Sequence, residues 1–273
     1  MSSFKSHRDH RGVEYITLNR PELHNAFNDE MIIELTNKFR DLKKDSTLRV
    51  VVLTGEGKSF CAGADLNWMK KMKDYSAEEN YQDSVKLAEM FEEINNCPVP
   101  VVGKINGAAL GGGSGLIAVC DIVIASNKAK LGFTEARLGL LPAVISPFVV
   151  AKIGETHARA TFLSGEMIDS DRAMTMGLVH NVCSPEELDQ KVEEQVGKLL
   201  ESAPEASREA KKLIQSLMGY WKKSEYPVLK DFTCKTISRI RIGDEAQEGM
   251  NSLLEKRKPH WISDDGGASW ARK

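Results

Sequence analysis

A triple glycine between two apolar segments is the part of the chain best suited to chemistry. The segment Val99–Ile105 is apolar and rich in β-branched residues, and Gly111, Gly112 and Gly113 follow it before a second apolar stretch. Glycines at such a strand-to-helix turn leave no Cβ where another group must approach the backbone. The first N–H groups of the following helix then remain free to donate. The segment predicts a site for an anion, or for a carbonyl that becomes an oxyanion during a reaction.

A second glycine-containing turn lies upstream of the first. The buried-strand pattern Val50–Leu53 is followed by small and polar residues, by Gly63, and by a helical segment at Trp68–Met72. Two strand-to-helix turns in neighbouring βα units can each donate one backbone N–H to the same oxygen atom. Either turn alone is more often a plain connection between elements, so the prediction of an oxyanion site depends on the pair.

The order and spacing of these turns resemble those of the crotonase (enoyl-CoA hydratase/isomerase) superfamily. The resemblance extends from residue 10 to residue 262, and its matching segments are Asn19–Pro21, Asn25–Ala26, Phe60–Leu66, Asn106–Leu116, Cys120–Asp121, Phe133–Gly139 and Glu255–Lys258. It implies an α/β protein with the ClpP/crotonase-like fold of repeated ββα units and a C-terminal helical trimerisation region. It also implies an enzyme that acts on an acyl-CoA thioester.

Three catalytic groups follow from this resemblance. The backbone N–H groups of Ala64 and Gly112 are expected to hold the thioester oxygen when an enolate forms, and Glu135 is expected to be the catalytic acid/base. A single glutamate is usually a solvated surface charge. In an apolar acyl pocket, however, its pKa would be raised, and it could hold or deliver a proton at Cα or Cγ of the substrate.

The chain departs from the superfamily pattern at Gly115. Hydratases of the well-studied type carry a second glutamate there, which helps to activate the attacking water. With glycine at this place, isomerisation of the double bond by Glu135 alone is the first alternative. In a hydratase, the substrate's own carboxylate or a water held by Ser146 or by backbone groups would have to replace the missing glutamate. The second alternative is a non-catalytic acyl-CoA-binding protein, against which Glu135 and both intact turns argue.

Two further segments favour hydration. Asp65–Met69 and Leu140–Pro147 resemble a bacterial branch of methylglutaconyl-CoA (or carboxygeranoyl-CoA) hydratases, in which glycine at position 115 is ordinary. The sequence is therefore interpreted as that of a lyase that adds water to, or removes it from, the double bond of a 2-enoyl-CoA. Its acyl group is expected to be branched or carboxylated.

The resemblance also implies where the coenzyme A part of the substrate binds. The adenine and pantetheine are expected along residues 62–66, and Lys256 is expected to meet a phosphate, although a Lys-Arg-Lys cluster is more often a solvated helix end. Asp65 is expected to cap the helix that begins near Leu66. The predicted substrate-binding residues are Ala62, Ala64, Asp65, Leu66, Gly112, Gly115 and Lys256. Coenzyme A is part of the substrate, so no separate cofactor is expected.

Composition narrows the class of protein. The 273 residues are 41% hydrophobic and 28% charged, and the net charge is −2. This overall charge does not predict binding to nucleic acid or to an anionic membrane. The five cysteines are scattered without metal-ligand spacing, which predicts neither a disulfide framework nor a metal site. The polar N-terminus and the absence of a long apolar run predict a cytoplasmic protein without a membrane span.

Hydrophobic periodicity predicts the elements that position the site. Strands are predicted at Val13–Leu18, Arg49–Leu53, Val99–Ile105, Ile122–Ala125 and Lys130–Phe133, with helices between them; after Ile145 the strand signal fades and only helices are expected. We expect an α/β core at residues 1–200 and a helical region at 201–273 that covers the site and forms subunit contacts. Apolar helix faces that include Leu213, Phe232 and Ile237 predict a homotrimer or a dimer of trimers.

Overall fold

Two β-sheets form the framework of the molecule. The computed structural model describes residues 2–217 and 226–259, and its larger sheet has six strands. Their order across the sheet is β1 (Phe4–Arg8), β2 (Val13–Leu18), β3 (Val50–Gly55), β5 (Val101–Ile105), β7 (Ile122–Ser126) and β10 (Asn181–Cys183). All neighbours are parallel except β1, which is antiparallel to β2.

The smaller sheet is made of short strands, most of which come directly after a strand of the larger one. Its order is β4 (Ser59–Cys61), β6 (Ala108–Leu110), β8 (Lys130–Gly132) and β9 (Met167–Asp169), of which only β9 is antiparallel to its neighbour. The helices that follow are α2 (Leu66–Met72), α4 (Gly112–Ala118) and α5 (Ser146–Ser164). Each repeat thus runs from a strand in the large sheet to a strand in the small sheet and then to a helix. This confirms the expected α/β fold of ββα units.

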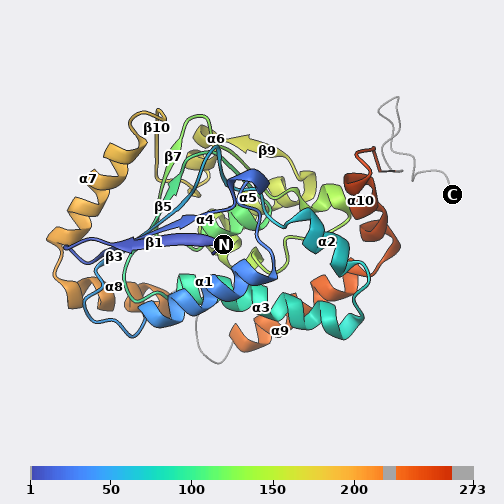
Figure 1. The fold of residues 1–273 in the computed structure, drawn as a ribbon, viewed down its shortest axis with the longest axis horizontal. Helices are drawn as coiled ribbons and strands as arrows, with labels where there is room; N and C mark the ends of the chain where they lie inside the picture. The colour runs from blue at the N-terminus through green and yellow to red at the C-terminus, as the bar shows by residue number, and fades with distance from the viewer. Residues whose placement is uncertain (1, 218–225, 260–273) are drawn as a thin grey trace.

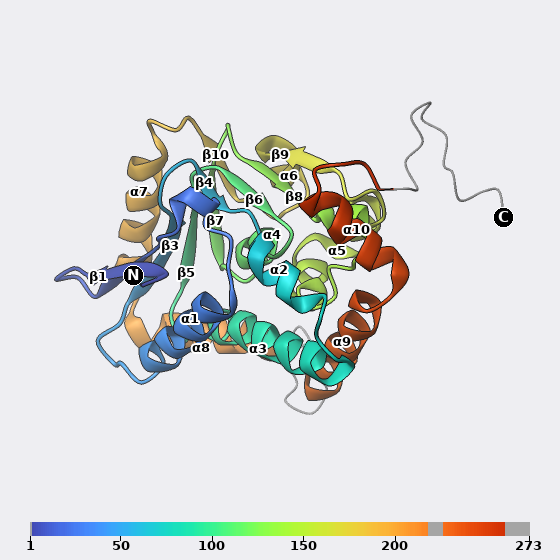
Figure 2. The same cartoon turned by 45° about the vertical axis from the view of Figure 1, so that its right-hand side comes forward.

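The remaining helices cover the sheets on two sides. Helices α1 (Asp29–Leu42), α3 (Ala77–Asn95) and α9 (Tyr226–Arg241) form a layer on one side, and α7 (Leu188–Glu201) covers the opposite face of the large sheet (Figure 1). Helix α10 (Asp244–Leu254) contacts α2 and the 3-10 helix η2 (Thr134–Leu138). Figure 2 shows α10 on the same side of the molecule as α2. The other helices are η1 (Pro21–Leu23), α6 (Ser170–Thr175) and α8 (Pro204–Leu217).

The large sheet is buried on both faces, and strand β3 shows the reason for its continuous apolar sequence. Val51 and Leu53 point into the main core, while Val50 and Val52 pack with Leu188 of α7 in a second cluster. Parallel strands covered by helices on both sides need apolar residues at every position rather than at every second one. The burial of successive residues therefore produces the pattern from which the strand was predicted.

Some elements were not predicted from the sequence. Strands β9 and β10 both follow Ile145, so the expectation of helices alone in that region was wrong. They are only three residues long, and β1 is an edge strand with mostly exposed side chains, so none of them carries an apolar run. Within residues 2–217 and 226–259, no helix has the length and apolar composition to cross a bilayer, and no His, Cys, Asp and Glu side chains cluster as metal ligands.

Candidate active site

A cavity of about 700 Å³ opens where the strands of the small sheet end. The turns after β4, β6 and β8 form its floor. Its walls come from α2, from the segment after η2, and from the C-terminal helices α9 and α10. The residues that line the cavity include Phe27, Trp68, Met69, Met72, Leu140, Pro142, Ile145, Ile237, Arg241 and Leu253. The cavity is mainly apolar, as expected for an acyl chain.

The three predicted catalytic positions occupy equivalent places in successive ββα units. Ala64 follows β4, Gly112 follows β6 and Glu135 follows β8, and all three line the cavity. These strands are parallel neighbours in the small sheet. The carboxyl ends of parallel strands meet at one edge of a sheet, so the repeat itself brings the three residues together.

The backbone N–H groups of Ala64 and Gly112 have no acceptor among the described residues. The neighbouring amides of Asp65 and Gly111 are both used, in hydrogen bonds of 3.0 and 2.8 Å to backbone carbonyls. Gly63 has a φ of +90°, and a Cβ built on it would lie 3.7 Å from the Gly112 nitrogen. The two turns therefore meet, with one free N–H from each, which is the arrangement of a two-donor oxyanion site.

Two glycines of the triple glycine permit close approaches that any side chain would prevent. A Cβ on Gly113 would lie 2.0 Å from the carbonyl oxygen of Cys61 at the end of β4. Gly111 has a φ of +52°, and a Cβ there would lie 3.2 Å from Oε1 of Glu135. The glycines let helix α4 begin against β4 and beside the carboxylate.

One oxygen of the Glu135 carboxylate, Oε2, is buried without a hydrogen-bond partner among the described residues. Burial disfavours the charged form and raises the pKa of Glu135 to about 7, against the smaller opposing effect of its own backbone N–H. A carboxyl group with this pKa can both accept and release a proton near neutral pH.

Asp65 has the capping role that the sequence predicted. Its side chain accepts hydrogen bonds from the backbone N–H groups of Asn67, at 2.7 Å, and Trp68, at 3.3 Å, at the start of α2. Arg20 donates to its other oxygen at 2.7 Å. The cap holds the turn that presents the Ala64 amide. Ala62 and Leu66 also line the cavity, as does Asp65.

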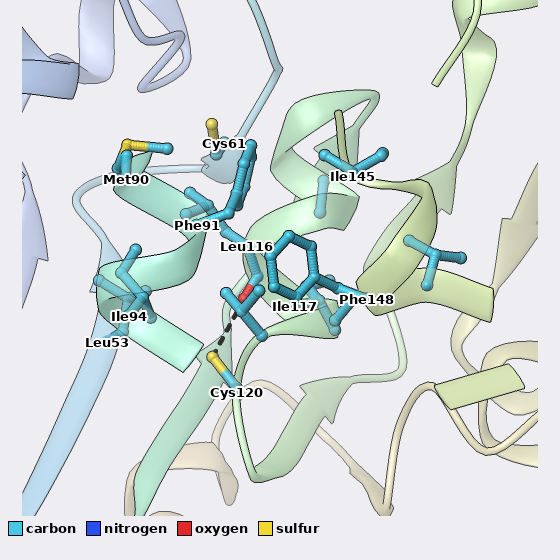
Figure 3. Packing of buried hydrophobic residues seen from close by; sticks show 14 of the residues in the cluster. Leu53, Cys61, Met90, Phe91, Ile94, Leu116, Ile117, Cys120, Ile145 and Phe148 are labelled. Carbon is cyan, nitrogen blue, oxygen red and sulfur yellow. Dashed lines mark hydrogen bonds between the residues drawn. The ribbon is translucent and has the colours of Figure 1, made fainter. Parts of the chain in front are cut away.

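Gly115 does not line the cavity, in contrast to the other predicted positions on the floor. It is buried in α4, and a Cβ there would lie 2.4 Å from Cγ2 of Ile145 and 3.1 Å from Cε1 of Phe91. Figure 3 shows Ile145 and Phe91 beside this helix. Ile145 itself lines the cavity, so its side chain takes the space that a larger residue at position 115 would need.

The Ser146 hydroxyl has a hydrogen-bond partner within its own turn. Its hydroxyl donates to the carbonyl of Ala143 at 2.7 Å, and the residue does not line the cavity. The side chain closes the turn before α5, and the holding of the attacking water by Ser146 stays a prediction.

This packing predicts the outcome of restoring a glutamate. Gly115→Glu alone is expected to lower the Tm and not to gain crotonyl-CoA hydration, because overpacking a core costs about 1–3 kcal/mol. Gly115→Glu combined with Ile145→Gly removes the blocking side chain and is expected to hydrate crotonyl-CoA faster than Ile145→Gly alone, measured as loss of the conjugated-enoyl absorbance. Equal rates for the double variant and its single-variant control would show that residue 115 cannot reach the acyl group.

Lys256 lies outside the cavity lining, just beyond the end of α10. It is exposed and has a φ of +55°. Arg257 forms ion pairs with Glu248 and Glu255, whereas no ion pair of Lys256 is found within the described residues. Leu253, one turn earlier, does line the cavity. Binding of a phosphate by Lys256 stays a prediction.

Residues at the far end of the cavity were missed from the sequence. Trp68 and Arg241 line it, and Arg241 forms an ion pair at 3.2 Å with Asp83 of α3. These residues lie in amphipathic helices without any motif. A single charge on the buried face of each of two helices is the only signal that could have indicated them.

Two free backbone N–H groups beside a glutamate, on ββα repeats, form the arrangement expected of an enzyme of the crotonase superfamily. The family model described as enoyl-CoA hydratase/isomerase matches residues 8–264. The chain belongs to this family, whose members include hydratases and isomerases of enoyl thioesters.

Similar proteins include some that are named hydratases and one that is named an isomerase. A short-chain-enoyl-CoA hydratase of Clostridium acetobutylicum is 30% identical, covering 90% of this chain and 92% of its own. A trans-2-decenoyl-(acyl-carrier-protein) isomerase of Streptococcus mutans is 28% identical, covering 91% and 94%. The crystal structure of an enoyl-CoA hydratase from Shewanella pealeana is 34% identical with a TM-score of 0.77, covering 95% of this chain and 96% of that one.

Proposed function

We propose that the protein is a hydratase that adds water to the double bond of a 2-enoyl-CoA with a branched or carboxylated acyl group. The observation that carries the proposal is the Glu135 carboxylate, one oxygen of which lacks a hydrogen-bond partner among the described residues, in the same cavity as the free N–H groups of Ala64 and Gly112. Coenzyme A enters as part of the substrate, and no other cofactor is needed. A non-catalytic binding protein would have no use for a glutamate buried at this cost.

Glu135 can serve both proton transfers of the reaction. Its ionised form accepts a proton from water as the water oxygen attacks C3, and the π electrons move to the thioester carbonyl. The resulting enolate oxygen accepts hydrogen bonds from Ala64 and Gly112, each donor contributing about 3–4 kcal/mol of stabilisation. Glu135 then returns the same proton to C2, so one carboxylate suffices for net addition of water.

Isomerisation is the alternative that the same groups support. Glu135 would take a proton from C2 of a 3-enoyl thioester and deliver it to C4 through the same enolate. The absence of a second carboxylate at position 115 favours this alternative, as does the isomerase among the similar proteins. The resemblance of residues 65–69 and 140–147 to methylglutaconyl-CoA hydratases favours hydration.

A substrate panel separates these activities. Crotonyl-CoA, 3-methylglutaconyl-CoA and a 3-enoyl-CoA are each incubated with the protein, and the products are identified by mass spectrometry and by the conjugated-enoyl absorbance. We expect hydration of 3-methylglutaconyl-CoA to be the fastest reaction. Conversion of the 3-enoyl-CoA alone, without any hydrated product, would make the protein an isomerase.

The pKa of Glu135 predicts the pH dependence of the reaction. Since the proposed reaction begins with ionised Glu135, kcat/KM is expected to fall about tenfold per pH unit below an apparent pKa of about 7 and to be level above it. Initial rates at subsaturating substrate across pH 5–9 provide the measurement. A profile that instead falls above pH 7 would assign Glu135 the role of an acid that starts protonated.

We also propose a homotrimer or a dimer of trimers. Leu213, Ile214 and Phe232 of α8 and α9 are 58%, 61% and 64% exposed, and closed symmetric assembly is the usual way to cover such residues. Ile237 was expected in the same contact but is 4% exposed and packs into the protomer's own core. Sedimentation velocity at micromolar concentration is expected to show a trimer or hexamer, and a stable monomer would contradict this proposal.

A further inference from the structure

Arg241 places a buried, incompletely paired cation on the wall of the acyl cavity. The residue is 7% exposed at the end of α9, and its one side-chain hydrogen bond within the described residues runs from Nη1 to Asp83 at 3.2 Å. Nε and Nη2 have no partner in the described parts of the chain. A guanidinium has five N–H donors, so most of them are left for a ligand. Unpaired donors in an apolar site cost free energy unless something accepts from them.

A second donor lies in the same region. The indole of Trp68 is 2% exposed and lines the cavity, and its Nε1–H makes no hydrogen bond to the described residues. This N–H faces the Asp83 carboxylate that pairs with Arg241, and it lowers the pKa of Asp83 against the larger effect of burial. Trp68 of α2 therefore supports the Asp83–Arg241 pair, and the donors that remain for an anionic acceptor are those of Arg241 on α9.

The position of this pair relative to the thioester follows from the packing between them. A Cβ on Gly112 would touch the ring of Phe27, and the Phe27 and Trp68 rings meet edge to face with centroids 6.2 Å apart. Trp68 therefore lies one aromatic ring beyond the oxyanion site, and the Asp83–Arg241 pair adjoins it. Apolar residues, including Met72 and Ile237, line the cavity beside it.

We propose that Arg241 binds a carboxylate at the far end of the acyl chain, so that the enzyme selects acyl-CoA substrates with a terminal carboxyl group. Asp83 holds the guanidinium in place and competes with the substrate for it. A methyl-terminated chain would displace water from these N–H donors without providing an acceptor. This cost is the physical basis of the preference for a terminal carboxylate. The inference names the substrate class for the proposed hydratase and rests on that function for its biological meaning, but it can be tested by binding alone.

The test compares dissociation constants of two unreactive ligands, glutaryl-CoA and pentanoyl-CoA, by calorimetry. They differ chiefly in the terminal carboxylate. The wild type is expected to bind glutaryl-CoA at least about tenfold more tightly, since a hydrogen-bonded charge contributes about 1.5–3 kcal/mol. In Arg241→Met the ratio should fall to about one. In Asp83→Asn it should rise, because the competing carboxylate is gone.

Arg239→Met is the matched control, since Arg239 is an exposed arginine on the same helix. It should keep the wild-type ratio. Binding of free coenzyme A tests whether Arg241 contacts a phosphate of the coenzyme instead. If Arg241→Met raises the dissociation constant of free coenzyme A as much as that of glutaryl-CoA, Arg241 binds a phosphate and the inference fails.

The remaining outcomes are also decisive. A wild-type ratio near one, or an unchanged ratio in Arg241→Met, overturns the carboxylate site. If Arg241→Met does not fold, Asp83→Asn decides, because a purely structural ion pair predicts no gain in the ratio. Turnover of crotonyl-CoA is measured separately, so loss of the proposed hydratase function would not be mistaken for loss of this site.

Discussion

Glu135→Gln is expected to abolish turnover while the fold and acyl-CoA binding remain. Glutamine keeps the shape of the side chain but cannot exchange a proton, so kcat should fall at least about a thousandfold, within the range attributed to general acid–base catalysis. Stopped assays with 3-methylglutaconyl-CoA and crotonyl-CoA provide the measurement, with binding of glutaryl-CoA as the check on the site. A variant that keeps a tenth of the wild-type kcat would have lost only about 1.4 kcal/mol of transition-state stabilisation, and Glu135 could not then be the acid/base.

The same variant should be more stable than the wild type at neutral pH. Folding raises the pKa of Glu135 from 4.5 to about 7, so the native state binds more protons than the unfolded state between these values. The wild type therefore loses up to about 3 kcal/mol as the pH rises through this window, while Glu135→Gln does not. Urea unfolding at pH 4.5 and pH 8 should show a gain for the variant only at pH 8. A variant less stable than the wild type at pH 8 would mean that the carboxylate has a partner in solution.

Gly112→Val is expected to remove the oxyanion site. A Cβ at this position would lie 2.3 Å from Cζ of Phe27, so the helix start, the ring or both must move and the Gly112 amide loses its direction. Loss of one oxyanion donor lowers kcat by about a hundredfold to a thousandfold. Acyl-CoA binding should weaken together with kcat, because the same amide holds the ground-state carbonyl.

Gly197→Val is the control for the cost of valine in place of glycine. Nothing lies within 4 Å of a Cβ on Gly197, which is in α7 on the far side of the large sheet from the cavity. Its kcat should equal that of the wild type. If Gly112→Val does not fold, Gly112→Ala tests the same contact with the smallest side chain. A folded, fully active alanine or valine variant would rule out Gly112 as the donor.

Local sequence patterns were sufficient to predict the floor of the site. Gly63 and Gly113 are needed where turns meet the backbone of neighbouring strands. The apolar runs at Val50–Leu53 and Val99–Ile105 follow from burial on both faces of a parallel sheet. Glu135 follows β8, the third strand of the small sheet. These features depend on residues close together in the chain. The same segments carry the resemblance to the crotonase superfamily, which implied the ββα repeat and the catalytic roles predicted for the two amides and Glu135.

The environment of these groups was decided by tertiary packing. Glu135 titrates near neutrality because distant segments exclude water from it, Ile145 fills the space in front of Gly115, and α9 brings Arg241 against Trp68 and Asp83. Each contact joins helices or turns from separate parts of the chain. In the sequence, these side chains are ordinary members of amphipathic helices and loops. Which of them face the cavity is determined by how the helices dock on the sheets, and no local pattern encodes that geometry.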